Sequence, residues 1–157
     1  MKIEKVLGTL PENPEKEVDY ICIDWYNACK KIQRLTSKKG REVGISLDEH
    51  TAHHGLKEND ILWEEEDFFL AVEVLPCEVL VVSGEDAPLI PKICYEIGNR
   101  HAPFFYHHNH KDFITPYDKP IQVMLKKIGA SVKVETLKIN LNHNISSSHG
   151  GGHSHSH

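Results

Sequence analysis

The most restrictive pattern in this sequence lies after Pro76, where two helix signals alternate with segments typical of strands. Residues 78–83 (EVLVVS) are rich in Val and Leu, as in a buried strand. A helix is then predicted from Asp86, a good N-cap residue, to the stop signal at Gly98-Asn99. Its apolar residues recur at helical spacing, at Leu89, Ile90, Ile93, Cys94 and Ile97.

Two more strands and a second helix follow. Residues 103–108 and 112–117 predict strands that flank a turn near Asn109-His110. Asp118 can cap the second helix, whose first turn contains a proline, and Gly129 ends it.

Residues 131–139 (SVKVETLKI) alternate in polarity and predict a last strand. The resulting order β-α-β-β-α-β is that of the split βαβ, or ferredoxin-like, unit. We therefore expect two helices on one face of an antiparallel sheet over residues 75–141.

Residues 1–74 indicate a different, β-rich domain. Many short strands with frequent turns, including one at Lys38-Lys39-Gly40, suggest a small barrel or sandwich. The acidic run 64–67 is interpreted as the exposed tip of a hairpin. The predicted fold class is thus α+β, with a β-barrel-like domain over 1–74 before the ferredoxin-like domain.

From about residue 142 the chain is dominated by Ser, Gly, Asn and His, with Ile145 as its single core-forming residue. Such a segment buries too little apolar surface to offset its ordering entropy, so we expect 142–157 to be a disordered tail until a ligand binds. A histidine-rich composition is typical of metal binding, and imidazole suits Ni(II), Cu(II) and Zn(II). The candidate ligands are His143, His149, His153, His155 and His157.

Other histidines have both structural and metal-binding interpretations. His101 follows a helix end, where a cation is favoured by the macrodipole, and is also a candidate ligand. In a strand, His107 and His108 would point to opposite faces, whereas His108 and His110 could meet at the hairpin tip. The segment DEHTAHHG has helical i, i+3, i+4 spacing and could hold zinc, but we expect a polar loop.

Several functional classes are disfavoured. The net charge of −5 argues against a nucleic-acid-binding protein, and no apolar run approaches the ~20 residues of a membrane span. The four cysteines are scattered without a CxxC motif, which indicates reduced thiols in the cytoplasm. No phosphate loop, GxSxG or HExxH motif is present, and no motif places a general base for a metalloenzyme, so we do not expect an enzyme.

Several stretches together resemble the UreE family of urease accessory metallochaperones. They are EVGISL, GLKENDIL, EVLPCEVLVV, IGNRHAPFF, YHHNH and the histidine-rich terminus, in the family's order. The resemblance implies an N-terminal domain similar to a chaperone peptide-binding module and a ferredoxin-like metal domain. It also implies a cytoplasmic homodimer joined through the C-terminal domains. The sequence leaves open whether the protein is a dimer or a metal-bridged tetramer.

The resemblance assigns roles to particular residues. The histidine of GNRH, His101 here, would lie at the dimer interface and face its copy across the two-fold axis. His108 and His110 would be peripheral metal ligands, with Asn109 between them where the family has an acid, and His143 is a further peripheral candidate. Tail histidines would complete the shell around Ni(II), with Zn(II) and Cu(II) as competitors.

The function that the resemblance implies is delivery of nickel. The transfer partner is the urease accessory GTPase, and the final acceptor is apo-urease. The alternative is a peptide- or partner-binding chaperone module whose tail buffers metal incidentally.

Overall fold

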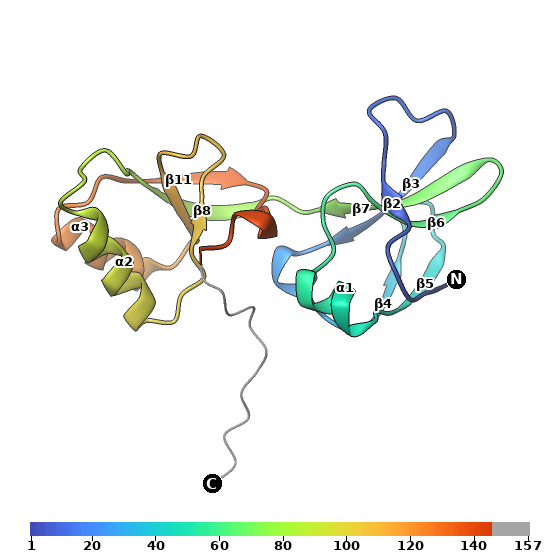
Figure 1. The fold of residues 1–157 in the computed structure, drawn as a ribbon, viewed down its shortest axis with the longest axis horizontal. Helices are drawn as coiled ribbons and strands as arrows, with labels where there is room; N and C mark the ends of the chain where they lie inside the picture. Colours follow the sequence, from blue (N-terminus) through green and yellow to red (C-terminus); the bar gives the residue numbers. More distant parts are fainter. Residues whose placement is uncertain (146–157) are drawn as a thin grey trace, which may run out of the picture. The chain divides into compact units, whose positions relative to one another are not determined.

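The computed structural model describes residues 1–145, which form two compact units. The N-terminal unit comprises Met1–Pro76 and Lys138–Leu141. The C-terminal unit comprises Cys77–Leu137 and the segment that begins at Asn142. Figure 1 shows the helices and strands of both units.

The N-terminal unit is built mainly from strands. Its elements are β1 (Lys2–Ile3), β2 (Gly8–Thr9), β3 (Glu17–Ile23), the 3-10 turn η1 (Trp25–Asn27), β4 (Ile32–Thr36), β5 (Glu42–Ser46), α1 (Glu49–His54), β6 (Asp60–Glu64) and β7 (Phe68–Val74). Two sheets result, with strand orders β1-β5-β4 and β2-β6-β7-β3. The β3–β7 pair is parallel, and Glu17 lies opposite Phe68.

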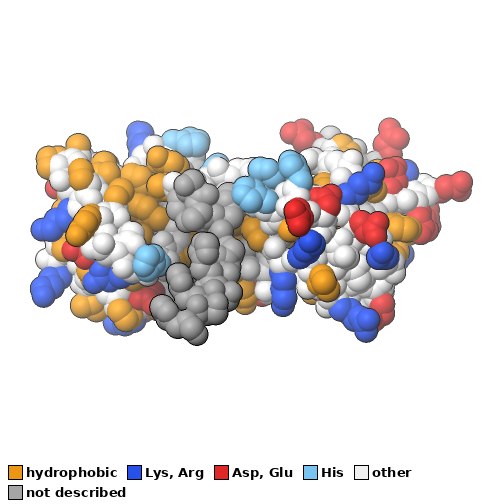
Figure 2. All heavy atoms as spheres, turned by 60° about the horizontal axis from the view of Figure 1, so that its bottom comes forward, with side chains coloured by type: hydrophobic (Ala, Val, Ile, Leu, Met, Phe, Trp, Pro, Cys, Tyr) orange, Lys and Arg blue, Asp and Glu red, His pale blue; other side chains and the backbone are white. Residues whose placement is uncertain are grey.

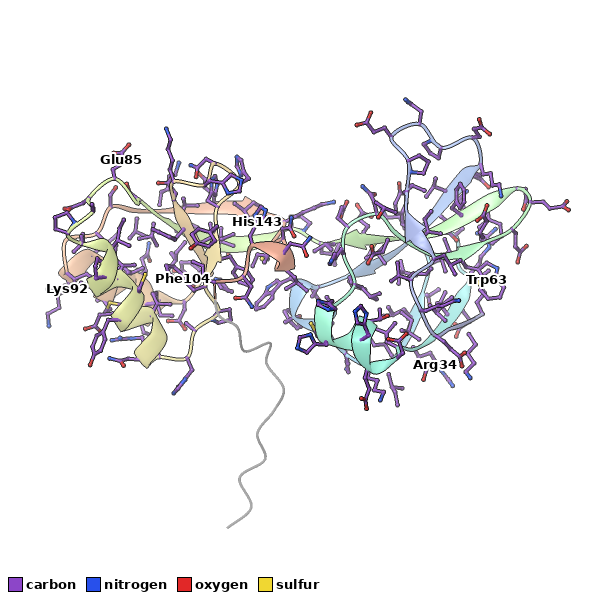
Figure 3. The ribbon with its side chains drawn as sticks, in the orientation of Figure 1. Arg34, Trp63, Glu85, Lys92, Phe104 and His143 are labelled. Atoms are coloured by element: carbon purple, nitrogen blue, oxygen red, sulfur yellow. The ribbon has the colours of Figure 1, made fainter. Side chains whose placement is uncertain are left out.

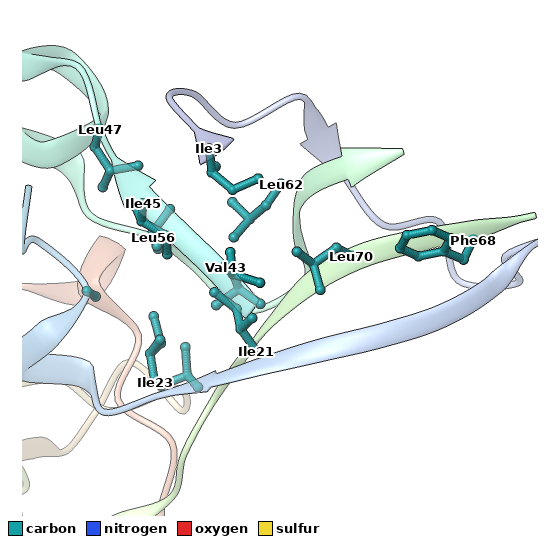
Figure 4. Close-up of a cluster of buried hydrophobic side chains, with 13 residues drawn as sticks. Ile3, Ile21, Ile23, Val43, Ile45, Leu47, Leu56, Leu62, Phe68 and Leu70 are labelled. Carbon is teal, nitrogen blue, oxygen red and sulfur yellow. The ribbon is translucent and has the colours of Figure 1, made fainter. Parts of the chain in front are cut away.

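One core joins these two sheets. Ile45 of β5 lies in the same buried cluster as Ile21 of β3 and Leu70 of β7, and Figure 4 shows these side chains directed toward one another. Within the described residues the strands form two separate sheets and no closed barrel, so the barrel-like prediction is wrong in that respect. The strands are short, so hydrogen-bonded pairing does not continue from one sheet to the other. Buried side chains connect the two sheets instead.

Local predictions for this unit have mixed outcomes. The turn at Lys38-Lys39-Gly40 is confirmed, because β4 and β5 pair antiparallel around it and Gly40 has φ +83°. The acidic run is confirmed as an exposed tip between β6 and β7. The polar loop expected for DEHTAHHG is wrong, because residues 49–54 form helix α1.

The C-terminal unit has the expected β-α-β-β-α-β order. Its elements are β8 (Cys77–Val82), α2 (Ile90–Asn99), β9 (Phe105–Tyr106), β10 (Phe113–Pro116), α3 (Lys119–Lys127) and β11 (Val132–Leu137), followed by the 3-10 turn η2 (Leu141–His143) that begins in the other unit. The sheet order is β11-β8-β10-β9, with every neighbouring pair antiparallel. The first and last strands of the motif therefore lie side by side.

Both helices pack on one face of this sheet (Figure 1). Ile93 and Ile97 of α2 are fully buried with Leu80 of β8, as their spacing predicts. Asp118 caps α3 as expected, its carboxylate accepting a hydrogen bond from Ile121 N–H at 2.9 Å. Helix α2 begins later than predicted, because residues 86–89 form a turn that precedes Ile90.

Among the described residues, no helix has the length and apolar character needed to cross a membrane.

A close backbone approach holds the end of β8 against the turn before β10. The Gly84 N–H donates to the Asp112 carboxylate at 3.2 Å. A Cβ atom at Gly84 would collide with the Lys111 carbonyl oxygen, which is backbone and cannot rotate away. Only glycine fits at this position without a shift of the turn.

We predict that Gly84→Ala lowers the free energy of unfolding of the C-terminal unit by about 2 kcal/mol, because the added methyl forces the two backbones apart. Denaturant unfolding measures this loss. Gly98→Ala in α2 is the matched control in the same unit, since a Cβ there meets no atom within 4 Å, and it should not lower stability because alanine is the better helix former. Equal stability of the two variants would refute the close approach.

Candidate metal centre

His101 lies immediately beyond the C-terminal end of α2. The helix ends with Arg100 in right-handed geometry, and His101 then adopts the left-handed region at φ 52°. Its N–H donates to the Gly98 carbonyl oxygen at 2.9 Å, which satisfies one of the free carbonyl groups at the helix end. The His101 side chain is exposed.

The neighbours of His101 make this position rigid. Ile97 precedes it by one helical turn and is fully buried, and Phe104 follows three residues later in the same core. An exposed imidazole between two buried anchors is held in place by backbone geometry. Such a ring can meet a ligand or a second chain without rearrangement of the fold.

His107 has a structural role that the strand prediction missed. Strand β9 ends at Tyr106, and the chain turns at His107, whose N–H donates to the Asp112 carbonyl oxygen at 2.9 Å. The His107 side chain is buried, and its Nδ1 accepts a hydrogen bond from Asn109 N–H at 3.3 Å. The Nδ1 lone pair is engaged in that bond, and Nε2 is buried without a hydrogen-bond partner among the described residues.

Asn109 holds the turn together. Its side-chain oxygen accepts from the N–H groups of Lys111 and Asp112, both at 2.9 Å. Its side-chain NH₂ donates to the Asp112 carboxylate at 2.8 Å, which lowers the pKa of Asp112, as does the Gly84 N–H. Because its pKa is lowered, the Asp112 carboxylate stabilises the fold at pH values above the ordinary aspartate pKa. This stability is lost as the pH falls through the lowered pKa. An acid at position 109 could not donate this bond.

The candidate peripheral histidines pair differently from the prediction. The rings of His107 and His108 lie 3.9 Å apart between centroids, so these side chains do not point to opposite faces. His110 lies instead near His143 of η2, with ring centroids 5.6 Å apart. His108 and His110 are both exposed, and the turn rather than a strand sets their directions.

The segment after η2 runs beside strand β9. Asn144 forms a bridge with Phe105, and the Ile145 N–H donates to the Phe104 carbonyl oxygen at 2.9 Å. The Ile145 side chain packs against the same core as Phe104. Figure 3 labels Phe104 beneath the sheet and His143 in η2. The last described residue, Ile145, is therefore bonded to Phe104, which lies three positions after His101 in the sequence.

These histidines do not form a closed metal site. Within residues 1–145, no group of three or more His, Cys, Asp or Glu side chains is arranged to hold an ion. His149, His153, His155 and His157 lie outside the described residues. The unit therefore offers single or paired imidazoles, which give an incomplete coordination shell.

Sequence reasoning missed two features of this region. The turn network of Asn109 and Asp112 has a recognisable signal, because Asn and Asp favour side-chain bonds to nearby backbone N–H groups. The helical state of residues 49–54 also has a signal, since Asp48 is a good N-cap residue directly before the histidines.

Two family models match the sequence. The model described as "UreE urease accessory protein, N-terminal domain" matches residues 3–75, and "UreE urease accessory protein, C-terminal domain" matches residues 77–157. Similar curated proteins carry the name "Urease accessory protein UreE". One from Helicobacter pylori is 37% identical over 141 residues, which covers 88% of this chain and 82% of the relative. Relatives from Helicobacter acinonychis and Helicobacter bizzozeronii are 36% and 35% identical, over 88% and 93% of this chain and 82% and 83% of their own lengths.

We predict that His101→Gly raises the free energy of unfolding of the metal-free protein by about 1 kcal/mol, because glycine removes the steric cost of a left-handed backbone. Thermal or denaturant unfolding measures this gain. Arg100→Gly is the matched control. Arg100 has φ −91° and pairs with Glu96 at 2.8 Å, so its loss should destabilise by about 0.5–1 kcal/mol. A destabilised His101→Gly protein would show that the imidazole itself supports the fold.

Proposed function

This chain belongs to the UreE family of urease accessory proteins, and on that premise we propose that it is a nickel metallochaperone. It binds Ni(II) through histidine imidazoles and delivers the ion to apo-urease. The family and the relatives are described as accessory proteins of urease, in agreement with the prediction that the chain is not an enzyme.

The observation that carries this proposal is the hydrogen bond from Ile145 N–H to the Phe104 carbonyl oxygen, 2.9 Å long. It fixes the start of the histidine-rich segment near His101. Three residues span at most about 11 Å, so Phe104 lies within that distance of His101. Four residues from Ile145 to His149 span up to about 14 Å, and twelve to His157 up to about 43 Å. Covalent geometry thus allows His153, His155 and His157 to reach His101, and His149 to come near it.

The proposed site combines rigid and tail donors. His101 and His101 of the partner subunit supply two imidazoles across the two-fold axis of a homodimer formed by the C-terminal units. His149, His153, His155 and His157 from one or both subunits supply the rest. Nickel(II) accepts more than four nitrogen and oxygen donors, so water and additional tail imidazoles complete the shell.

An incomplete rigid site suits delivery of a metal. A closed set of four fixed ligands would retain the ion, whereas donors on a tail can be replaced one at a time. The entropy lost when the tail orders around the ion subtracts from affinity and so promotes release. Transfer is then ligand exchange, in which the ligands of the acceptor replace the tail histidines.

Weaker sites and competing ions follow from the same chemistry. The exposed imidazoles of His108 and His110 and the half-buried imidazole of His143 bind additional ions peripherally, and the rings of His110 and His143 lie 5.6 Å apart. Zn(II) and Cu(II) compete for all of these imidazoles. Shared ions between dimers would produce a metal-bridged tetramer.

The partners are other urease maturation proteins in the cytoplasm. By family, the accessory GTPase receives the ion before apo-urease does. The N-terminal unit provides surface for protein contacts, and its exposed acidic tip between β6 and β7 is available to a basic partner.

We predict that His101→Gly weakens the tightest nickel site by about 100-fold or more, since loss of an outer-shell partner alone typically costs 10–100-fold. Isothermal titration of the full chain with Ni(II) measures this. His108→Ala, which removes another exposed imidazole from the same unit, should leave the tight site within about threefold of its original affinity.

The tail makes a separate contribution that the same titration resolves. Substitution of His149, His153, His155 and His157 by Ser keeps the length of the chain and should weaken the tight site while dimers persist. Unchanged affinity would favour the alternative function, a partner-binding module whose tail buffers metal incidentally.

We also predict a steep pH dependence, with nickel affinity falling below about pH 6, because protons compete with the ion for each imidazole nitrogen. Titrations at several pH values test this directly. A flat affinity from neutral to acidic pH would be incompatible with an all-imidazole shell.

A further inference from the structure

Helix α1 carries a histidine cluster far along the chain from the proposed nickel site. The helix spans Glu49–His54 and is capped at both ends. The Asp48 carboxylate accepts a hydrogen bond from Thr51 N–H at 2.7 Å. Gly55 has φ 74°, and its N–H donates to the Thr51 carbonyl oxygen at 2.8 Å. Both caps fix the conformation of a helix that would not be stable in isolation.

The residues on either side of α1 anchor it to the core of the N-terminal unit. Leu47 and Leu56 are each 1% exposed. The Leu47 N–H donates to the Lys31 carbonyl oxygen at 2.8 Å, and the Leu56 N–H donates to the Ala28 carbonyl oxygen at 3.0 Å. The backbone that carries the histidines is therefore a rigid platform.

The histidines of α1 form one exposed group. His50, His53 and His54 are all exposed, and Figure 2 shows histidines gathered as a pale-blue patch beside acidic side chains on the N-terminal unit. His50 and His54 are four residues apart and share a helix face, with ring centroids 4.6 Å apart. The ring of His53 lies 5.1 Å from that of His54.

The separation of the His50 and His54 rings fits a shared ion. An ion about 2.1 Å from one nitrogen of each imidazole lies about 3.2 Å from each ring centroid, so rings in neighbouring coordination positions have centroids about 4.5–5 Å apart. Two histidines at i and i+4 on one helix face are also the spacing that binds zinc in metalloprotease helices.

The charges around the cluster favour a cation. The Asp48 carboxylate, which caps the helix, lies two residues before His50. The Glu49 side chain is 94% exposed and lies 3.8 Å from Lys31. The two acids offset the repulsion that a bound divalent ion meets at the positive end of a helix.

We propose that His50 and His54 form a second metal site, which binds one borderline divalent cation such as Ni(II), Cu(II) or Zn(II) independently of the C-terminal unit. Two imidazoles on a prefixed helix lose little entropy on binding, and water occupies the remaining positions. The site is weaker than one with three or more protein ligands. His53 lies beside the site and is not one of its two ligands.

Nuclear magnetic resonance of the full, isotopically labelled chain tests this site, with Ni(II) alone as the paramagnetic probe. Amide signals of residues 49–56 should broaden at low Ni(II) concentration. His50→Gln and His54→Gln should each weaken this response about tenfold or more, because each removes half of the chelate. His53→Gln, the matched control on the same helix, should leave it within about threefold. Equal losses in all three variants, or no broadening in this helix, would overturn the proposal.

A second variant separates this site from the proposed tail site. In the full chain with His149, His153, His155 and His157 replaced by Ser, the broadening around α1 should persist. Its disappearance would show that the tail carries the ion to α1, which would also overturn the proposal. Broadening of the amide signals near His101 reports separately on the proposed nickel site. Either proposal can therefore be refuted while the other stands.

Discussion

The hydrogen bond between Ile145 N–H and the Phe104 carbonyl oxygen is the constraint on which the proposed mechanism depends. This bond extends the sheet beyond β9. The Ile145 side chain packs against the hydrophobic core that α2 also covers. The histidine-rich segment therefore starts beside a fixed point rather than from a free end. Such tethering raises the effective concentration of tail imidazoles around His101 without any additional contact.

Rigid and exchangeable donors have separate origins in this chain. The end of α2 fixes His101 in left-handed geometry, and Asn109 and Asp112 fix the turn that carries His108 and His110. Within the described residues none of these groups closes a shell around an ion. A metal carrier benefits from this arrangement, because the fold positions the first donors and exchange of the others controls release.

Sequence patterns predicted features that depend on local spacing. The apolar stripe of α2 and the Asp118 cap of α3 are both confirmed, since residues within one turn determine them. The parallel β3–β7 pair depends on contacts between residues about 50 positions apart, which no local pattern contains. The close approach of the His107 and His108 rings follows from a two-residue strand that ends earlier than its composition indicates. The expectation of a loop at residues 49–54 is wrong because the Asp48 side chain caps a helix there, and this short polar helix has no apolar stripe to mark it.

X-ray absorption spectroscopy of the nickel-loaded full chain tests the central claim most directly, because it identifies the donor atoms around the ion. We expect a shell of nitrogen and oxygen donors with the scattering pattern of several imidazoles, and fewer imidazoles in the His101→Gly protein. A shell dominated by sulfur or carboxylate oxygen, or an identical spectrum after loss of His101, would contradict the account.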